Sequence, residues 1–188
     1  MSDASDTGGA LRTKKAPAGP LVAPPLFRNR SASADDAAPT LYFATLHARA
    51  VEGDGAALNA LATAYFSGHS GVAPDKEKAV YYWRMAADRG HPSAQCSLGL
   101  CLFKGEGVEY DDDEALRLFR LAADRGDAKA EVCLGRVYEL GDGVAEDAAA
   151  ALEWYERAAA KGDETAKAAI AKNPSWAAAA GGFNVYEV

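Results

Sequence analysis

The sequence predicts an all-α solenoid, a stack of antiparallel helix pairs. Three observations lead to this prediction. Equivalent residues recur every 36 positions, since Gly107 follows Gly71 at that distance and Gly143 follows Gly107 at the same distance. Each period contains two stretches with apolar residues at helical spacing, and glycine-rich turns separate them. One such helix pair cannot bury its own apolar face, so neighbouring pairs must stack.

Composition and charge agree with a folded core and exclude several classes of partner. Hydrophobic residues make up 49% of the 188 residues, and the formal net charge is −7. Residues 1–40 hold five basic and four acidic side chains, so the remaining region is the acidic part. An acidic folded region repels phosphate backbones, and we expect no nucleic-acid partner. No apolar run reaches the roughly 20 residues that cross a bilayer, and we expect no membrane partner.

The three cysteines, Cys96, Cys101 and Cys133, show no CxxC spacing. Cys96 and Cys101 are five residues apart, so on a helix they point about 140° away from each other and do not readily pair. Free, mostly buried thiols in a reducing compartment are the simplest interpretation. The opening stretch MSDASDTGGA also lacks the charged and apolar regions of a signal peptide. We therefore expect a soluble, cytoplasmic protein.

Residues 1–40 are predicted to be disordered, because they are rich in Ala, Pro, Ser, Gly and Asp and show no periodicity. Within them, Ser31 and Ser33 follow two arginines at a spacing that basophilic kinases accept. Phosphorylation there would add charge to the segment. Such short runs are common in disordered tails, so a segment without this role is the favoured interpretation.

A degenerate capping half-repeat is predicted over 41–57. The stretch LYFATLHARAVEGDG has the pattern of a repeat's second helix, with Ala50 in the column of paired alanines and Gly53 near the closing glycine. A half-unit at this place would cover the first apolar face of the stack.

Three full repeats are predicted next, and they span 58–93, 94–129 and 130–165. The first helix of the middle repeat, AQCSLGLCLFKG, has Ala94, Leu98 and Leu102 on one stripe. Glycines then reverse the chain, because they adopt positive φ without strain. The second helix, DDDEALRLFRLAADRG, has a second apolar stripe that ends at a glycine.

Seven residues in the repeated columns are expected to have a structural role. They are turn glycines, small alanines and large aromatic residues, namely Gly107, Gly143, Ala115, Ala151, Trp83, Phe119 and Tyr155. Small residues at shared positions let helix backbones approach closely, while the bulky position fills the gap between helix layers.

Four consecutive acids, from Asp111 to Glu114, follow a Gly-x-Gly turn and raise the question of a metal site or a carboxylate pair. Only the first position keeps an acid in every repeat, as Asp75, Asp111 and Asp147. An Asp there accepts hydrogen bonds from free N–H groups at the start of a helix. A calcium loop would need alternating ligands and a distal Glu, which are absent. We therefore predict helix capping, and no metal or cofactor.

The sequence after residue 165 begins another first helix, which meets Pro174. We predict a partial capping helix over 166–174, which would cover the last apolar face, and a flexible tail over 175–188. The terminal VYEV has the form of a strand that adds to a carboxylate-binding domain such as a PDZ domain. A free end is the favoured interpretation.

The repeated columns resemble the Sel-1-like repeat, a branch of the tetratricopeptide-type helical repeats. The pattern of that repeat is approximately A-x3-L-G-x2-Y-x2-G-x-G-V, followed by K-A-x2-W-Y-x2-A-A-x2-G. The third unit matches it closely, with Ala130, Leu134-Gly135, Tyr138, Gly141, Gly143-Val144, Ala151, Trp154-Tyr155, Ala158-Ala159 and Gly162.

The other two units depart from the pattern at a few positions. The second unit has Leu102 for the Tyr and Leu118-Phe119 for the Trp-Tyr pair. In the first unit the alignment puts Ala62-Thr63 at the Leu-Gly positions, Phe66 at the Tyr position and His69 at the first turn glycine.

The resemblance covers 58–166 and implies a right-handed α-α superhelix that holds protein partners together, typically as an adaptor and without catalysis. In tetratricopeptide-type stacks the first helices line the concave face. The partner-binding residues predicted on that face are Cys96, Leu100, Phe103, Lys104, Val132, Arg136 and Glu139. The matching positions of the first repeat are Ala60, Ala64, Ser67 and Gly68.

An apolar centre with flanking cations suits an extended peptide or a helix. The alternative is that Leu100, Phe103 and Val132 pack against neighbouring helices. We predict a protein-binding adaptor or scaffold; the alternatives are a regulatory subunit of an enzyme complex and a self-associating repeat fragment.

Three features suggest chemistry, and each has a simpler interpretation. The stretch SGHSG half resembles a nucleophile elbow around Ser70, but Val72 stands where that motif needs Gly. The three histidines are scattered without ligand spacing. The cysteines lie inside helical patterns without an obvious His partner. We therefore do not expect an enzyme.

Overall fold

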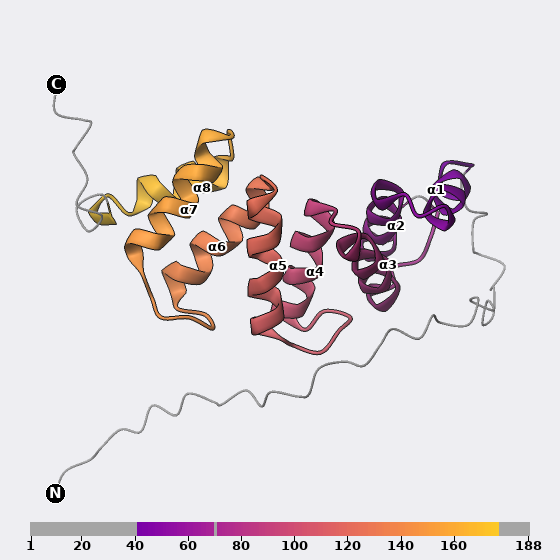
Figure 1. Cartoon of the computed structure of the whole chain (residues 1–188), viewed down its shortest axis with the longest axis horizontal. Coiled ribbons are helices and arrows are strands. Elements are labelled where there is room, and N and C mark those ends of the chain that lie inside the picture. Colours follow the sequence, from indigo (N-terminus) through magenta and orange to yellow (C-terminus); the bar gives the residue numbers. More distant parts are fainter. Residues whose placement is uncertain (1–40, 70, 177–188) are drawn as a thin grey trace, which may run out of the picture. The chain divides into compact units, whose positions relative to one another are not determined.

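The computed structural model describes residues 41–69 and 71–176, and these residues form only helices and their connections (Figure 1). The helices are α1 (Leu41–Val51), α2 (Gly55–Ser67), α3 (Lys76–Asp88), α4 (Pro92–Lys104), α5 (Asp112–Asp124), α6 (Ala128–Leu140), α7 (Ala148–Ala160) and α8 (Glu164–Lys172). The segment 1–40, which includes Ser31 and Ser33, and the terminal VYEV lie outside the described residues, so the predictions made for them stay predictions.

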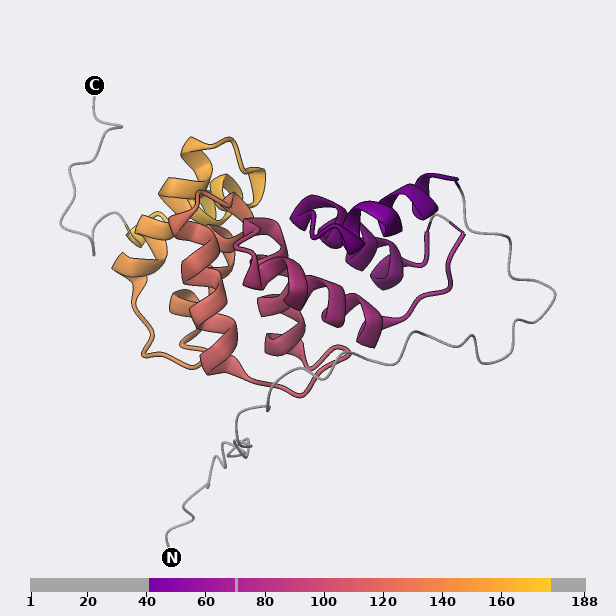
Figure 2. The same ribbon diagram turned by 45° about the vertical axis from the view of Figure 1, so that its right-hand side comes forward.

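The helices pack in consecutive pairs. Helix α2 packs on α3, α4 on α5 and α6 on α7, and each second helix also packs on the first helix of the next pair. Helices α1 and α8 are half-units at opposite ends of this stack, which the turned view of Figure 2 also shows. The predicted all-α solenoid of antiparallel helix pairs is confirmed.

Aspartates begin the second helix of every pair. Asp75, Asp111 and Asp147 precede α3, α5 and α7, and each carboxylate accepts a hydrogen bond from a backbone N–H in the first turn. For Asp111 the partner is the N–H of Glu114, at 3.0 Å. The predicted capping role is confirmed. In the part of the chain that is described, no group of three or more His, Cys, Asp or Glu residues could hold a metal ion.

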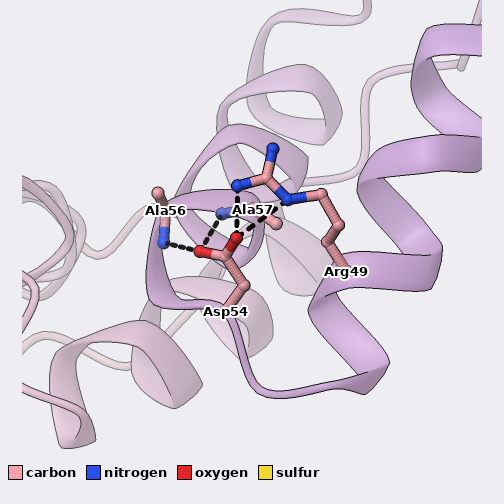
Figure 3. A network of polar contacts seen from close by, with 4 residues as sticks. All are labelled: Arg49, Asp54, Ala56 and Ala57. Atoms are coloured by element: carbon pink, nitrogen blue, oxygen red, sulfur yellow. Dashed lines mark hydrogen bonds and ion pairs between the residues drawn. The ribbon is translucent and has the colours of Figure 1, made fainter.

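A similar cap joins α1 to α2 (Figure 3). The Asp54 carboxylate accepts hydrogen bonds from the N–H groups of Ala56 (2.9 Å) and Ala57 (3.2 Å), and its other oxygen accepts one from Nε of Arg49 (2.9 Å). The bonds from the Ala57 N–H and the Arg49 guanidinium hold the pKa of this carboxyl below its ordinary value. The capping half-unit is thereby tied to the first full pair.

Glycine at two equivalent positions lets the two helices of a pair touch. A Cβ atom at Gly99 would lie 2.7 Å from Cε1 of Phe119, and one at Gly135 would lie 2.8 Å from Cε1 of Tyr155. The aromatic ring of the second helix therefore rests directly on the backbone of the first helix. This contact explains why Leu is followed by Gly in repeats two and three.

A second glycine position brings neighbouring repeats together. Gly107 has a φ of 70°, and a Cβ atom there would lie 2.5 Å from the carbonyl oxygen of Lys76 in the preceding repeat. Gly143 has a φ of 76°, and a Cβ atom there would lie 3.2 Å from a carboxylate oxygen of Asp112. Both residues favour glycine for the left-handed conformation, and Gly107 needs it also for the close approach to the backbone of the preceding repeat.

The first repeat is one residue longer than the others, which the sequence alignment missed. Helix α4 starts 37 residues after α2, whereas α6 starts 36 residues after α4. The extra residue lies in the connection, because Asp75 follows the C-cap Gly68 by seven residues, while Asp111 follows Gly105 by six.

This insertion shifts the register of α2 by one. Leu61-Ala62 hold the Leu-Gly positions, Tyr65 holds the Tyr position and Gly68 is the turn glycine. The assignment of Ala62-Thr63, Phe66 and His69 to those positions was wrong. The first repeat therefore fits the family pattern better than the sequence alignment indicated.

The core runs along the stack between the helices of each pair. The repeated alanines Ala79, Ala115 and Ala151 are fully buried, and the largest fully buried side chains include Phe119 and Tyr155. At the far end, Trp176 stacks on Tyr155 with ring centroids 5.8 Å apart. The predicted repeat starts at 58, 94 and 130 fall inside α2, α4 and α6, and the predicted segment limits stay predictions.

Candidate functional site

The first helices expose the side that points away from the second helices. In α4 the buried side chains include Ala94, Leu98, Cys101 and Leu102. The opposite side of α4 is partly exposed to solvent, and α6 and α8 have their equivalent positions 36 and 72 residues further along the chain. We name this side of the first helices the first-helix face, and it comprises Leu100, Phe103, Lys104, Lys129, Val132, Arg136, Glu139, Leu140 and Lys172.

Five of the seven predicted partner-binding residues are at least partly exposed to solvent on this face, so a partner could contact them. Lys104 and Arg136 are exposed, and Leu100, Val132 and Glu139 are partly exposed. Leu100 and Val132 pack on the core from the outside and leave part of each side chain in water. Helices α4 and α6 therefore each present a partly exposed apolar side chain and an exposed cation.

The other two predicted residues belong mainly to the interior. Cys96 is only 2% exposed. The ring of Phe103 packs on those of Phe119 and Tyr110, with centroids 6.4 and 6.5 Å apart. Phe103 therefore packs mainly against neighbouring side chains of the stack, which is the alternative interpretation given above for this residue.

The position of Phe103 meets an aromatic residue of the second helix in every repeat. In the first repeat, Phe66 packs on Trp83 with centroids 5.3 Å apart. In the third, Glu139 replaces the phenylalanine, and its Oε2 accepts a hydrogen bond of 2.7 Å from the hydroxyl of Tyr155. Burial, together with this bond to a carboxylate, raises the pKa of Tyr155.

The face of the first repeat differs from the prediction because of the shifted register. Ala64, predicted to face a partner, is buried at 1% exposure. Asn59, Thr63, Phe66 and Ser67 take the positions assigned to Ala60, Ala64, Ser67 and Gly68. The amide oxygen of Asn59 accepts a hydrogen bond of 3.1 Å from the indole of Trp83, so this part of the face is uncharged and partly occupied.

A thiol pair beneath the face was missed by the sequence analysis. Cys96 of α4 donates a hydrogen bond to Cys133 of α6, and the two helices are in direct contact. The bond from Cys96, helped by Arg136 and Lys104, lowers the pKa of Cys133, whereas the same pairing and burial raise that of Cys96. All three cysteines are free, as predicted.

The sequence held a usable signal for this pair. The first helices of repeats two and three start 36 residues apart, so Cys96 and Cys133 occupy adjacent positions of neighbouring helices. Adjacent positions on helices in contact place their side chains next to each other.

A buried carboxylate was also missed. Glu131 of α6 is 0% exposed, and its oxygens lie 3.2 Å from Nε of Arg157 and 2.9 Å from Nζ of Lys161. Lys161 also donates to the carbonyl oxygen of Gly126, at 3.0 Å. The guanidinium of Arg157 lies over the ring of Trp154, 4.3 Å from its centroid. These contacts tie α5, α6 and α7 together, and we assign Glu131 a structural role.

The residues considered for chemistry are placed as follows. Ser70 lies outside the described residues. His91 caps α4, and its Nδ1 accepts from the N–H of Ala94 at 3.4 Å. The ring of His47 shares a hydrogen bond of 3.2 Å with the hydroxyl of Tyr82. Of the described helices, none is long and apolar enough to cross a membrane.

The fold and this face define a helical-repeat solenoid of the tetratricopeptide type. The family model described as "Sel1 repeat" matches three successive segments, 55–91, 92–127 and 128–163. These segments cover more than half of the chain, which therefore belongs to the Sel1 repeat family. Proteins of this family are in general protein-interaction scaffolds.

Two solved structures agree with this assignment. A Sel1 repeat protein from Oxalobacter formigenes is 32% identical in sequence, with a TM-score of 0.65, over 70% of this chain and 53% of that one. A protective antigen of uropathogenic Escherichia coli with an SLR fold, c5321, is 27% identical, with a TM-score of 0.54, over 72% of this chain and 37% of that one. The chain thus spans about half or less of the length of these proteins. No curated protein matches it in sequence.

Proposed function

We propose that this protein is a non-catalytic adaptor or scaffold that binds a segment of a partner protein on its first-helix face. The observation that carries the proposal is that Leu100 and Val132, apolar residues of two first helices in contact, stay partly exposed, while Lys104 and Arg136 of the same helices are exposed. Apolar side chains with cations on the same helices suit a peptide or a helix.

The test begins with a pull-down from a lysate of the source cells, with partners identified by mass spectrometry. The wild type is compared with the variant Leu100→Glu plus Arg136→Glu, which must keep its helical circular dichroism. The matched control is Arg117→Glu plus Arg120→Glu, which makes two substitutions to Glu on α5. Each candidate partner is then purified and its affinity measured by calorimetry.

We expect a partner that binds the wild type and the control but binds the face variant at least about tenfold more weakly, a loss of about 1.4 kcal/mol. Equal affinity for all three proteins would exclude the first-helix face as the binding surface. Hydrolysis of ester or amide substrates that disappears in Ser70→Ala would overturn the non-catalytic part of the proposal.

One observation favours self-association as a second candidate function. Leu41 and Val51, on the end helix α1, are 86% and 84% exposed. End-to-end contact between two copies would cover these side chains. Sedimentation at increasing concentration tests this, and a monomer at all concentrations would exclude it.

The cytoplasm is the location we propose, because three free thiols suit a reducing compartment. Imaging of the tagged full-length protein in the source cells tests the proposal. Accumulation outside the cytoplasm would contradict it.

A further inference from the structure

The first-helix face carries a charge of opposite sign to the rest of the chain. Its cations are Lys104, Lys129, Arg136 and Lys172, and its only carboxylate among the described residues is Glu139. The formal charge of this face is therefore positive, whereas the whole chain carries −7. In a protein with an excess of acids, this grouping of cations on one side of the first helices is a specific feature of the surface.

These four cations have no acidic partner within the described residues. The described ion pairs use other cations, namely Arg49, Lys76, Lys78, Arg117, Arg157, Lys161 and Lys167. These ion pairs use seven of the fifteen described cations, and the face holds four of the eight that remain unpaired with an acid.

The acids nearest to the face already have donors of their own. Glu139 accepts the hydroxyl of Tyr155 at 2.7 Å. Asp127 accepts the N–H of Ala130 and the hydroxyl of Ser93, both at 3.0 Å. Neither carboxylate forms an ion pair with Lys104, Arg136 or Lys129 within the described residues, so an external carboxylate would find free donors.

The cations converge from two repeats. Lys104, at the end of α4, and Arg136, in α6, both act on the thiol of Cys133, and Lys129 acts on that of Cys96. These three cations therefore lie near the thiol pair at the contact of α4 with α6, and the carboxylate of Asp127 acts on both thiols as well. Leu100 and Val132 supply partly exposed apolar surface at the same junction.

We propose that the first-helix face of α4, α6 and α8 binds an acidic segment of a partner protein, whose carboxylates pair with Lys104, Arg136 and their neighbours while an apolar side chain packs on Leu100 and Val132. The proposal rests on the proposed function and adds the chemistry of the partner. Carboxylates pair with guanidinium and ammonium groups through charge-assisted hydrogen bonds. A nucleic acid fits less well, because a long polyanion would also meet the acidic remainder of the chain.

The test measures binding of labelled peptides to the full chain by fluorescence anisotropy. The probe is a Glu-rich peptide with isolated Leu residues, and the matched probes replace every Glu by Gln or by Lys. A single-stranded oligonucleotide of the same charge as the Glu peptide tests the alternative polyanion. The protein variants are Lys104→Glu plus Arg136→Glu, and the control with the same charge change on α5, Arg117→Glu plus Arg120→Glu.

We expect the Glu peptide to bind best, to weaken with added salt, and to bind the face variant at least about tenfold more weakly than the control. The same peptide should slow alkylation of Cys133 by iodoacetamide, because that thiol lies beneath the bound segment. This second readout locates the peptide without relying on a substitution that perturbs the fold.

Three results would overturn the proposal: equal binding of the Glu and Gln peptides, equal loss in the control variant, and tighter binding of the oligonucleotide. Its failure is distinguishable from that of the proposed function. If an identified natural partner depends on the first-helix face while the Glu peptide has no advantage, the face binds protein and only the acidic preference is wrong.

Discussion

The second and third repeats, 92–127 and 128–163, have the same backbone plan and different interiors. Their first helices both have 13 residues, and both end at a glycine in the left-handed conformation. Between the helices, the second repeat packs Phe103 on Phe119, whereas the third joins Glu139 to the hydroxyl of Tyr155.

A second interior position differs in the same way. Gln95 is 3% exposed, and its side chain donates to the carbonyl oxygen of Ala87 at 3.2 Å. Its equivalent, Glu131, is fully buried and pairs with Arg157 and Lys161. The first repeat has Leu58 at this position, which is 1% exposed.

The comparison shows at which positions the close packing of the helices restricts the side chain, and at which positions side chains of different chemistry are tolerated. The close contacts at Gly99 and Gly135 demand a very small residue. The Gln95/Glu131 position accepts an apolar, a polar or a charged side chain, provided that the second helix supplies a partner of matching chemistry. Such positions allow each repeat to differ while the stack stays the same.

The largest effect is expected from Glu131→Ala. This change creates a cavity and removes the acid that holds two cations, so the free energy of unfolding should fall by about 3 kcal/mol. Arg157 and Lys161 are 42% and 39% exposed, so they can turn into water, which limits the loss. Urea unfolding followed by circular dichroism measures it.

Glu131→Leu is the matched control, because it reproduces Leu58 of the first repeat. Replacing a buried ion pair by an apolar side chain of similar volume is often neutral, and we expect a change within about 1 kcal/mol. If this variant loses as much stability as Glu131→Ala, the ion pairs and not the filled volume stabilise the third repeat.

A smaller effect is expected when the aromatic residues are exchanged between the repeats. Tyr155→Phe removes the donor to Glu139 and should cost about 1 kcal/mol, because Glu139 is partly exposed and gains water instead. Phe119→Tyr should cost about 2 kcal/mol, because it places a hydroxyl beside Phe103 without a carboxylate to accept it.

The double change Tyr155→Phe plus Glu139→Phe gives the third repeat the pair of the second. Its stability in the same unfolding experiment should lie above that of Tyr155→Phe alone. A double variant that is less stable than the single variant would show that the two interiors are not interchangeable.

The parts of the fold that could be predicted from the sequence are those with local causes. Asp75, Asp111 and Asp147 cap helices through bonds to residues two or three positions on, and Gly107 and Gly143 mark turns, so spacing along the chain reveals them. The register of α2 could not be found in this way. The extra residue of the first repeat lies between Gly68 and Gly71. From Gly71 onward equivalent residues recur every 36 positions, so this spacing does not reveal that Tyr65 and Gly68 are displaced by one residue.

The candidate site was predictable only where helical spacing decides exposure, as for Lys104 and Arg136. The burial of Cys96 and its hydrogen bond to Cys133 depend on how α4 packs against α6. The spacing of apolar residues within one helix does not predict this packing. Glu131 was missed for the same reason. A glutamate in a helix is usually solvated, and only the cations of α7 explain its burial.

The smallest effect on stability, and a clear effect on chemistry, is expected from Cys96→Ala. The hydrogen bond from Cys96 lowers the pKa of Cys133, so Cys133 holds more thiolate at neutral pH than an ordinary cysteine does. Without that donor the pKa of Cys133 should rise. Alkylation of Cys133 by iodoacetamide at neutral pH should then slow by about threefold or more, and the rise of its rate with pH should move to higher pH.

Cys96→Ser is the control, because its hydroxyl can still donate to the Cys133 thiolate. Its alkylation profile should stay close to that of the wild type, while Cys101, which is buried and has its pKa raised to about 11 by burial, stays unreactive in all three proteins. If Cys96→Ala and Cys96→Ser slow the reaction equally, the packing of the Cys96 side chain matters and its hydrogen bond does not. If neither slows it, Arg136 and Lys104 alone determine the reactivity of Cys133, and the third repeat owes this property to its surface cations instead of its contact with the second.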